Sequence, residues 1–133
     1  MAFGANNVQT AKLQVFGRVG IDMLSGPSEA LIMADETSNP IYLAADILAR
    51  CEHGPDSAGV MVTNSMAIAQ QTLREVERQI PALKRQKFIQ TALDTYSAIV
   101  VVDSLEQMIA FANEYSAEHL EIQTQNPRKI LSR

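Results

Sequence analysis

The sequence predicts an α/β fold with an open, mostly parallel sheet and helices on both of its faces, in three layers. Two observations predict this class. Short, continuous apolar runs, typical of strands covered on both faces, alternate along the chain with longer segments whose apolar residues recur at helical spacing. A helix between two such strands makes the strands parallel within one sheet. The expected arrangement is therefore Rossmann-like.

The first half of the chain supplies two predicted strands and one helix. Residues 30–34 form one apolar run and residues 59–63 form a second. Pro40 marks the start of a helix between them, because proline at the first helical position loses no hydrogen bond. Apolar residues follow at helical spacing as far as Cys51, and the Gly-Pro pair at 54–55 ends the helix. Cys51 itself is expected to be a small buried hydrophobe.

The second half continues the alternation. An apolar stripe from Ala69 through Leu73 and Val76 to Ile80 predicts a helix that Pro81 closes or kinks. The remaining predicted elements are a helical stretch at 83–96, a β-branched strand at 98–103, a helix with a capping box at Ser104 and Gln107, a short strand at 120–122, and a helix start at Asn126 and Pro127.

Composition excludes several classes of protein. The net charge of −4 argues against a nucleic-acid surface, and the one basic cluster, at 84–87, is short and lacks aromatic partners for stacking. No apolar run is long enough to cross a membrane, and the first residues have no signal-peptide pattern. The single cysteine suits a reducing compartment. We therefore expect one cytoplasmic domain over residues 1–133 that binds neither nucleic acid nor membrane.

The only two histidines each follow a glutamate, in the pairs Glu52-His53 and Glu118-His119. Histidine has the side-chain pKa closest to neutral. A neighbouring carboxylate can raise this pKa and can orient the imidazole ring. Glu118-His119 falls between a predicted helix and a predicted strand and suits general acid/base work. The structural alternative is a loop or capping histidine beside a solvated glutamate.

The other candidates also have structural alternatives. His53 at a helix end is a favourable cation there, and zinc requires about four ligands that this chain does not provide at any recognised spacing. Ser28 suits a turn, where it would bond to its own backbone. Ligands of open parallel sheets bind outside the carboxyl ends of the strands. The loops at 26–28 and 35–37 both flank the strand predicted at 30–34.

Four blocks of sequence resemble histidinol dehydrogenase in their content, order and separation. They are AKLQVFGRVGIDMLSGPSE at 11–29, ADET at 34–37, CEHGPDS at 51–57 and SAEHLEI at 116–122. The resemblance extends over essentially the whole chain but covers only a central part of the family's length. It implies that residues 1–133 are a central fragment of such an enzyme, folded as one α/β domain.

The resemblance implies a homodimer that depends on zinc and NAD and oxidises a small amino alcohol. Histidinol is converted through an aldehyde to histidine in two hydride transfers. The matching positions make His119 the base that takes the alcohol proton and Glu118 the group that activates water at the aldehyde stage. They make Ser28 a substrate contact, and His53 both a substrate contact and a zinc ligand.

Two departures from the family pattern bear on the cofactors. The family's glutamine zinc ligand is replaced by Arg50, whose guanidinium stays protonated and has no lone pair to give a cation. In the turn that touches NAD, Gly4 is kept but Ala5 replaces asparagine. The remaining zinc ligands of the family lie beyond Arg133. We therefore expect this chain to be inactive alone; the alternatives are a paralogue for another small polar alcohol, or a non-catalytic α/β module.

Overall fold

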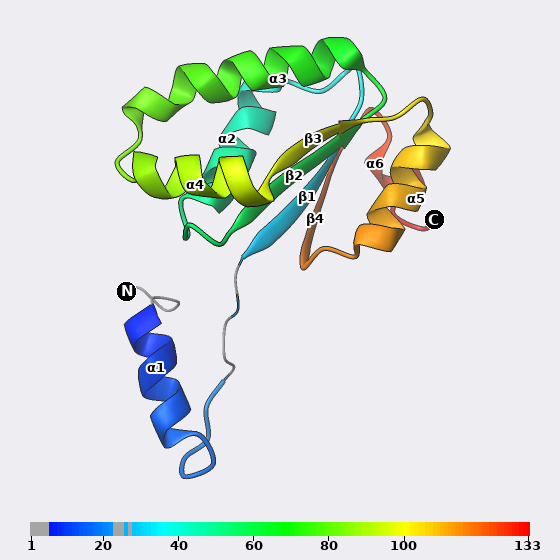
Figure 1. Cartoon of the computed structure of the whole chain (residues 1–133). Coiled ribbons are helices and arrows are strands. Elements are labelled where there is room, and N and C mark those ends of the chain that lie inside the picture. The colour runs from blue at the N-terminus through cyan, green and yellow to red at the C-terminus, as the bar shows by residue number, and fades with distance from the viewer. Residues whose placement is uncertain (1–5, 23–25, 27) are drawn as a thin grey trace.

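Four parallel strands form one sheet in the order β3-β2-β1-β4. The computed structural model describes residues 6–22, 26 and 28–133. The strands are β1 Glu29–Ala34, β2 Ala58–Thr63, β3 Ala98–Val101 and β4 His119–Gln123. The predicted parallel α/β sheet is therefore confirmed. The strands β1 and β2 lie at its centre, and the last strand in sequence, β4, pairs with β1 at one edge (Figure 1).

Helices cover both faces of the sheet (Figure 1). One face carries α2 Pro40–Cys51, α3 Met66–Gln79, the short 3₁₀ turn η1 Ile80–Ala82 and α4 Gln86–Tyr96. The other carries α5 Leu105–Tyr115 and α6 Pro127–Ile130. The helix α1, Asn6–Val15, lies apart from the sheet. None of the described helices is long and apolar enough to cross a membrane.

Each face of the sheet has its own apolar core. Alternate residues of a strand point to opposite faces, so Leu31 and Met33 pack toward α5 and α6, while Ile32 and Ala34 pack toward α2, α3 and α4. These four side chains are at most 1% exposed. Burial on both faces explains why the run at 30–34 is continuously apolar.

The helix starts are explained by their caps. Asn39 Oδ1 accepts a hydrogen bond from the Ile41 N–H at 3.0 Å, with Pro40 in the first turn as predicted. Ser104 Oγ accepts from the Gln107 N–H at 3.2 Å. One of the two hydrogen bonds of the predicted capping box is therefore present. The second is not, because the Gln107 side chain accepts from the Asp103 N–H and not from the Ser104 N–H.

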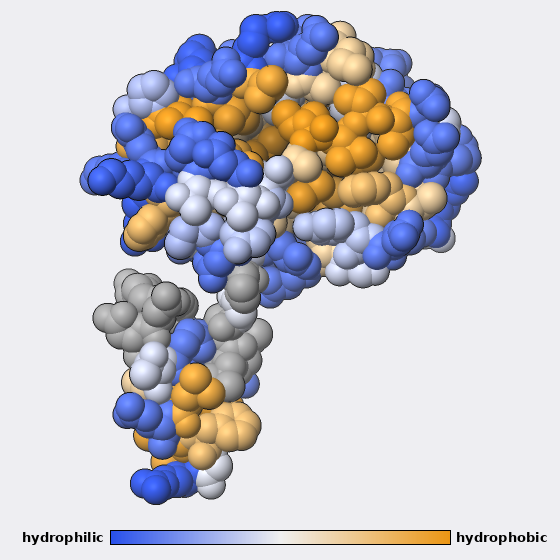
Figure 2. Space-filling view, viewed as in Figure 1, coloured by the Kyte–Doolittle hydropathy of each residue, from blue (hydrophilic) through white to orange (hydrophobic). Residues whose placement is uncertain are grey.

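Some sequence expectations differ from the structure in detail. The helix predicted from residue 83 begins at Gln86, because residues 84 and 85 form a turn. The strand predicted to residue 103 ends at Val101. Leu73, predicted to lie on the apolar stripe of α3, is 52% exposed, and Val101 of the edge strand β3 is 37% exposed. Figure 2 shows apolar side chains gathered over β3 on the visible face.

Asp35 joins the carboxyl end of β1 to the segment after β4. Its two carboxylate oxygens accept hydrogen bonds from the Thr37 N–H at 2.9 Å, the Thr37 hydroxyl at 2.6 Å and the Gln125 N–H at 2.9 Å. Partial burial opposes ionisation, but the bonds from Thr37 and Gln125 outweigh it, so the pKa of Asp35 lies below its ordinary value.

We expect Asp35→Asn to cost about 1 kcal/mol of unfolding free energy at pH 7, because an amide nitrogen cannot accept a hydrogen bond. A carboxyl whose folded pKa is depressed adds stability above its unfolded pKa and loses it as pH falls through the folded pKa. The difference between variant and wild type should therefore shrink in acid. Urea unfolding at pH 7 and pH 3 measures it, with the exposed Glu36→Gln as the control. A constant difference across this range would contradict the assignment.

Candidate active site at the amino end of the sheet

The candidate residues lie at the amino ends of the strands. Ser28 precedes β1, His53 lies in the turn between α2 and β2, and the pair Glu118-His119 lies where β4 begins. These candidates therefore lie at the end of the sheet opposite to the carboxyl ends, where ligands of open parallel sheets usually bind. The loop at 35–37 does lie there, and it is about 20 Å from Ser28 because a strand rises about 3.3 Å per residue.

Ser28 and His119 share the face of the sheet that α2 covers. In β4 the side chains of Glu121 and Gln123 contact α2, and His119 belongs to the same alternate set. In β1 the side chain of Ile32 packs in the core beneath α2, and the same alternation brings Ser28 to that face. The β1–β4 register pairs Ala30 with His119, so Ser28 and His119 are close along the strands as well.

Two side-chain contacts show how α2 runs along β4. Gln123 Nε2 donates to Asp46 Oδ2 at 2.6 Å, and Arg50 Nη2 lies 3.9 Å from Glu121 Oε1. Asp46 and Arg50 are four residues apart in α2, and their partners Gln123 and Glu121 are two residues apart in β4. Both separations correspond to about 6–7 Å, so the helix and the strand run side by side. The turn with Glu52-His53 follows the end of α2 directly, and Glu118-His119 lies at the start of β4. Both Glu-His pairs therefore lie at the amino end of the sheet, the acid/base corner of the molecule.

The side chains of Glu118 and His119 are exposed and lie close to each other. His119 Nε2 lies 3.8 Å from Glu118 Oε2, and the two side chains are 44% and 53% exposed. The left-handed residue Ser116, with φ 51°, ends α5 and turns the chain toward the pair. The Glu118 N–H donates to Glu29 Oε1 at 3.2 Å. An exposed imidazole beside a carboxylate can exchange protons with a bound molecule.

His53 is held by its turn and is also exposed. The His53 N–H donates to the Arg50 carbonyl at 3.0 Å, so the last turn of α2 tightens as it ends. Arg85 donates from Nη1 to the Glu52 carbonyl at 3.1 Å, which satisfies another carbonyl near this helix end. His53 therefore lies, with an exposed side chain, at the same end of the sheet as Ser28 and His119.

A family model described as histidinol dehydrogenase matches residues 2–133. The chain belongs to the histidinol dehydrogenase family. It is 47% identical to the histidinol dehydrogenase of Aliivibrio fischeri and 46% identical to that of Blochmanniella floridana, in each case over 97% of this chain and 30% of the relative. The chain therefore spans about three tenths of the length of these relatives.

A solved structure from the same family has the same fold. The crystal structure of histidinol dehydrogenase from Elizabethkingia anophelis aligns with a TM-score of 0.81 and 44% identity, covering 95% of this chain and 29% of that one. The resemblance to histidinol dehydrogenase inferred from the four sequence blocks is thus confirmed.

The zinc that the histidinol dehydrogenase resemblance implies does not fit the residues described for this chain. The resemblance places Arg50 at the position of a glutamine ligand, and the Arg50 guanidinium lies 3.9 Å from Glu121. Burial and the charge of Asp46 raise the pKa of Glu121, although Gln123 and Arg50 oppose the rise. Within the described ranges, no group of three histidine, cysteine, aspartate or glutamate side chains could hold a metal ion.

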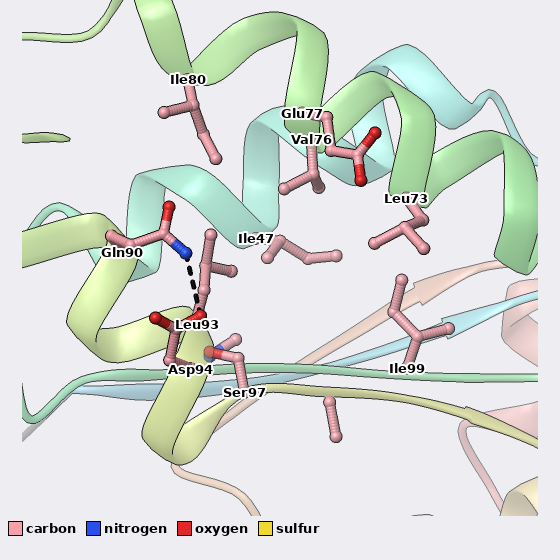
Figure 3. A pocket seen from close by; sticks show the side chains of 12 residues that line it. Ile47, Leu73, Val76, Glu77, Ile80, Gln90, Leu93, Asp94, Ser97 and Ile99 are labelled. Carbon is pink, nitrogen blue, oxygen red and sulfur yellow. Dashed lines mark hydrogen bonds between the residues drawn. The ribbon is translucent and has the colours of Figure 1, made fainter.

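The NAD-contacting turn expected at the start of the chain lies outside the described residues. Gly4 and Ala5 are not described, so their predicted role stays a prediction. An apolar groove of about 340 Å³ lies between α3, α4 and β3 (Figure 3). Its polar side chains include Gln90, which donates to Asp94 at 2.8 Å, but none of the candidate histidine, glutamate or serine residues reaches it.

Glu29, which bonds to the main chain of Glu118 from the opposite face of the sheet, was not among the predicted site residues. In the sequence, Glu29 is the last residue of the block at 11–29. A glutamate beside a serine gives no local signal of a distant contact, so its role could not be predicted. Its bond to the Glu118 N–H joins positions 89 residues apart in sequence. Knowledge that β1 and β4 are neighbours would have revealed it.

Proposed function

We propose that this chain carries the acid/base part of an oxidoreductase that converts L-histidinol through the aldehyde to L-histidine, with NAD as the hydride acceptor. The observation that supports the proposal is the common location of Ser28, His53 and His119. All three lie at the amino end of the sheet, two of them on the α2 face by strand alternation and the third in the turn that follows α2.

His119 is proposed as the base that removes the proton from the alcohol oxygen. As the C–O double bond forms, the hydride leaves the same carbon for NAD, which supplies the oxidising power when bound. Glu118 Oε2 lies 3.8 Å from the imidazole Nε2, which places the second acid/base group beside the first. At the aldehyde stage Glu118 takes a proton from water as the water attacks the carbonyl carbon and forms the hydrate. Oxidation of this hydrate to the acid would need a second NAD to accept the second hydride.

The charges near the corner favour a substrate with a cationic amino group. Carboxylates lie at this end of the sheet in the turn before β2 and just before β4: Glu52, Asp56 and Glu118. Arg50 is paired with Glu121 and Arg85 with a main-chain carbonyl, so both are engaged locally. A surface with excess negative charge attracts cations. Ser28 is the proposed hydrogen-bonding contact to the same substrate.

The family resemblance supports the remaining parts of the proposal. They are a cytoplasmic homodimer and a fragment, residues 1–133, that forms one α/β domain in the middle of a longer enzyme. Zinc dependence belongs to the family pattern, and His53 is the residue of this chain that would contribute to it. Arg50 does not fit a metal site, because its guanidinium has no lone pair to give a cation.

Arg50 favours a second candidate function. A paralogue that oxidises another small polar alcohol could use a charged side chain at a position where the family holds a metal ligand. The Arg50–Glu121 contact at 3.9 Å supports this candidate, since a guanidinium there alters the charge beside the substrate. A non-catalytic α/β module would need neither Glu118 nor His119 to be accessible.

A chimera tests the proposed function. The corresponding segment of the Aliivibrio fischeri relative is replaced by this chain, and NADH formation with L-histidinol is measured. We expect turnover, a rate at least about 10²-fold lower with His119→Asn because the general base is lost, and no change with the exposed Glu36→Gln. The isolated chain is the negative control, expected to be inactive and to bind zinc weakly by calorimetry.

The outcomes separate the candidates. A folded chimera that ignores L-histidinol contradicts the proposed function. Recovery of that chimera by Arg50→Gln, or turnover of another amino alcohol, favours the paralogue. Turnover by the isolated 133-residue chain would contradict the prediction that it is inactive alone.

A further inference from the structure

We propose that Glu29 is a positioning residue for the acid/base pair: its carboxylate fixes the main chain of Glu118 beside Ser28. The inference rests on the proposed function for its catalytic meaning. The contact itself, from the Glu118 N–H to Glu29 Oε1 at 3.2 Å, does not depend on that function.

The hydrogen bond lies just beyond the end of the β1–β4 ladder. The ladder begins with Ala30 opposite His119, so the amide of Glu118 precedes the paired residues of β4. Strand ends fray when their last amides have no partner. The Glu29 side chain supplies the acceptor at this point. A charged acceptor makes a stronger hydrogen bond than a neutral one.

Glu29 approaches from the face of the sheet opposite to the site. It belongs to the same alternate set as Leu31 and Met33, which pack toward α5. Burial, and to a lesser degree the charge of Glu29, raises the pKa of Tyr115 at the end of α5. Glu29 is therefore close to the helix end from which the chain turns, through Ser116, toward Glu118.

This placement gives Glu29 a specific effect on the site. Ser28 is its neighbour in sequence, and the Ser28 carbonyl accepts from the Ala58 N–H at 3.0 Å, which fixes Ser28 against β2. One carboxylate thus links the main chain of the proposed substrate contact to that of the acid/base pair. Catalytic geometry is sensitive to displacements of about 1 Å. Loss of Glu29 should therefore loosen His119 without unfolding the sheet.

Amide hydrogen exchange and thermal unfolding of the 133-residue chain test the proposal. In Glu29→Ala we expect exchange at Glu118 and His119 to accelerate at least about tenfold, the change that follows when about 1.4 kcal/mol of local protection is lost. Exchange at Ile32 in the middle of β1 should not change. Glu29→Gln should keep the protection, because its side-chain oxygen can still accept. The exposed Glu36→Ala is the matched control.

A ligand titration connects the contact to function. The ring signals of His53 and His119 are resolved by NMR while L-histidinol is added, and we expect the shift at His119 to weaken several-fold in Glu29→Ala but not in Glu29→Gln. Unchanged exchange in Glu29→Ala, or a Glu29→Gln variant as exposed to exchange as the alanine variant, would overturn the positioning role. If wild-type His119 does not respond to L-histidinol, that result contradicts the proposed function but not the positioning role of Glu29.

Discussion

Replacing Ile32 by alanine is expected to lower the free energy of unfolding by about 2–5 kcal/mol. Ile32 lies in the central strand β1, is 0% exposed, and packs in the core formed with α2, α3 and α4. Truncation removes apolar contacts and leaves a cavity between the sheet and α2, which the surrounding rigid elements cannot close fully. In a domain of this size, such a loss is a large share of the total stability.

Urea unfolding followed by circular dichroism measures this loss. Ile41→Ala is the matched control, because Ile41 has the same side chain but is 47% exposed at the start of α2. Its cost should stay below about 1 kcal/mol, since a surface substitution leaves no cavity. Equal costs for the two variants would mean that the core beneath α2 is not packed as described.

Replacing Gly59 by valine is expected to destabilise the fold by about 1–3 kcal/mol through overpacking. A Cβ on Gly59 would lie 3.0 Å from the Ile47 carbonyl oxygen and 3.2 Å from its Cα, and these are main-chain atoms of α2 that cannot rotate away. The Gly59 N–H also donates to Ser97 Oγ at 3.1 Å, so a shift of β2 away from α2 strains that bond as well.

Gly20→Val is the matched control for this substitution. A Cβ on Gly20 would have no neighbouring atom within 4 Å, so the added side chain meets open space. We expect its unfolding free energy to remain within about 0.5 kcal/mol of wild type. Thermal unfolding of both variants decides the matter, and a tolerated Gly59→Val would contradict the close approach of α2 to β2.

The parts of the fold with strong local patterns were predictable from sequence. The continuous apolar run at 30–34 and the helix beginning at Pro40 are confirmed because burial on both faces and a proline start leave clear signatures. The helix α1 was not predicted. Its apolar residues Leu13 and Val15 are 59% and 40% exposed, so no core-facing stripe marked it in the sequence.

The candidate site was only partly predictable for a topological reason. The Glu-His pairs are local, and each could be recognised as chemically suited without knowledge of the fold. The closeness of His119 to Ser28 depends on β4 lying beside β1, which follows from the strand order and not from any local pattern. For the same reason, the contact of Arg50 with Glu121 and that of Glu29 with Glu118 could not be foreseen.

The position of β4 has a kinetic consequence. Pairing β1 with β4 closes a loop of nearly ninety residues, as the separation of 89 between Glu29 and Glu118 shows, whereas β1 and β2 are joined by a single short crossover. Closing a longer loop costs more conformational entropy, and distant pairings slow folding. We therefore expect β4 to be added last, so that a partly folded chain has a nearly complete sheet but no acid/base corner beside Ser28.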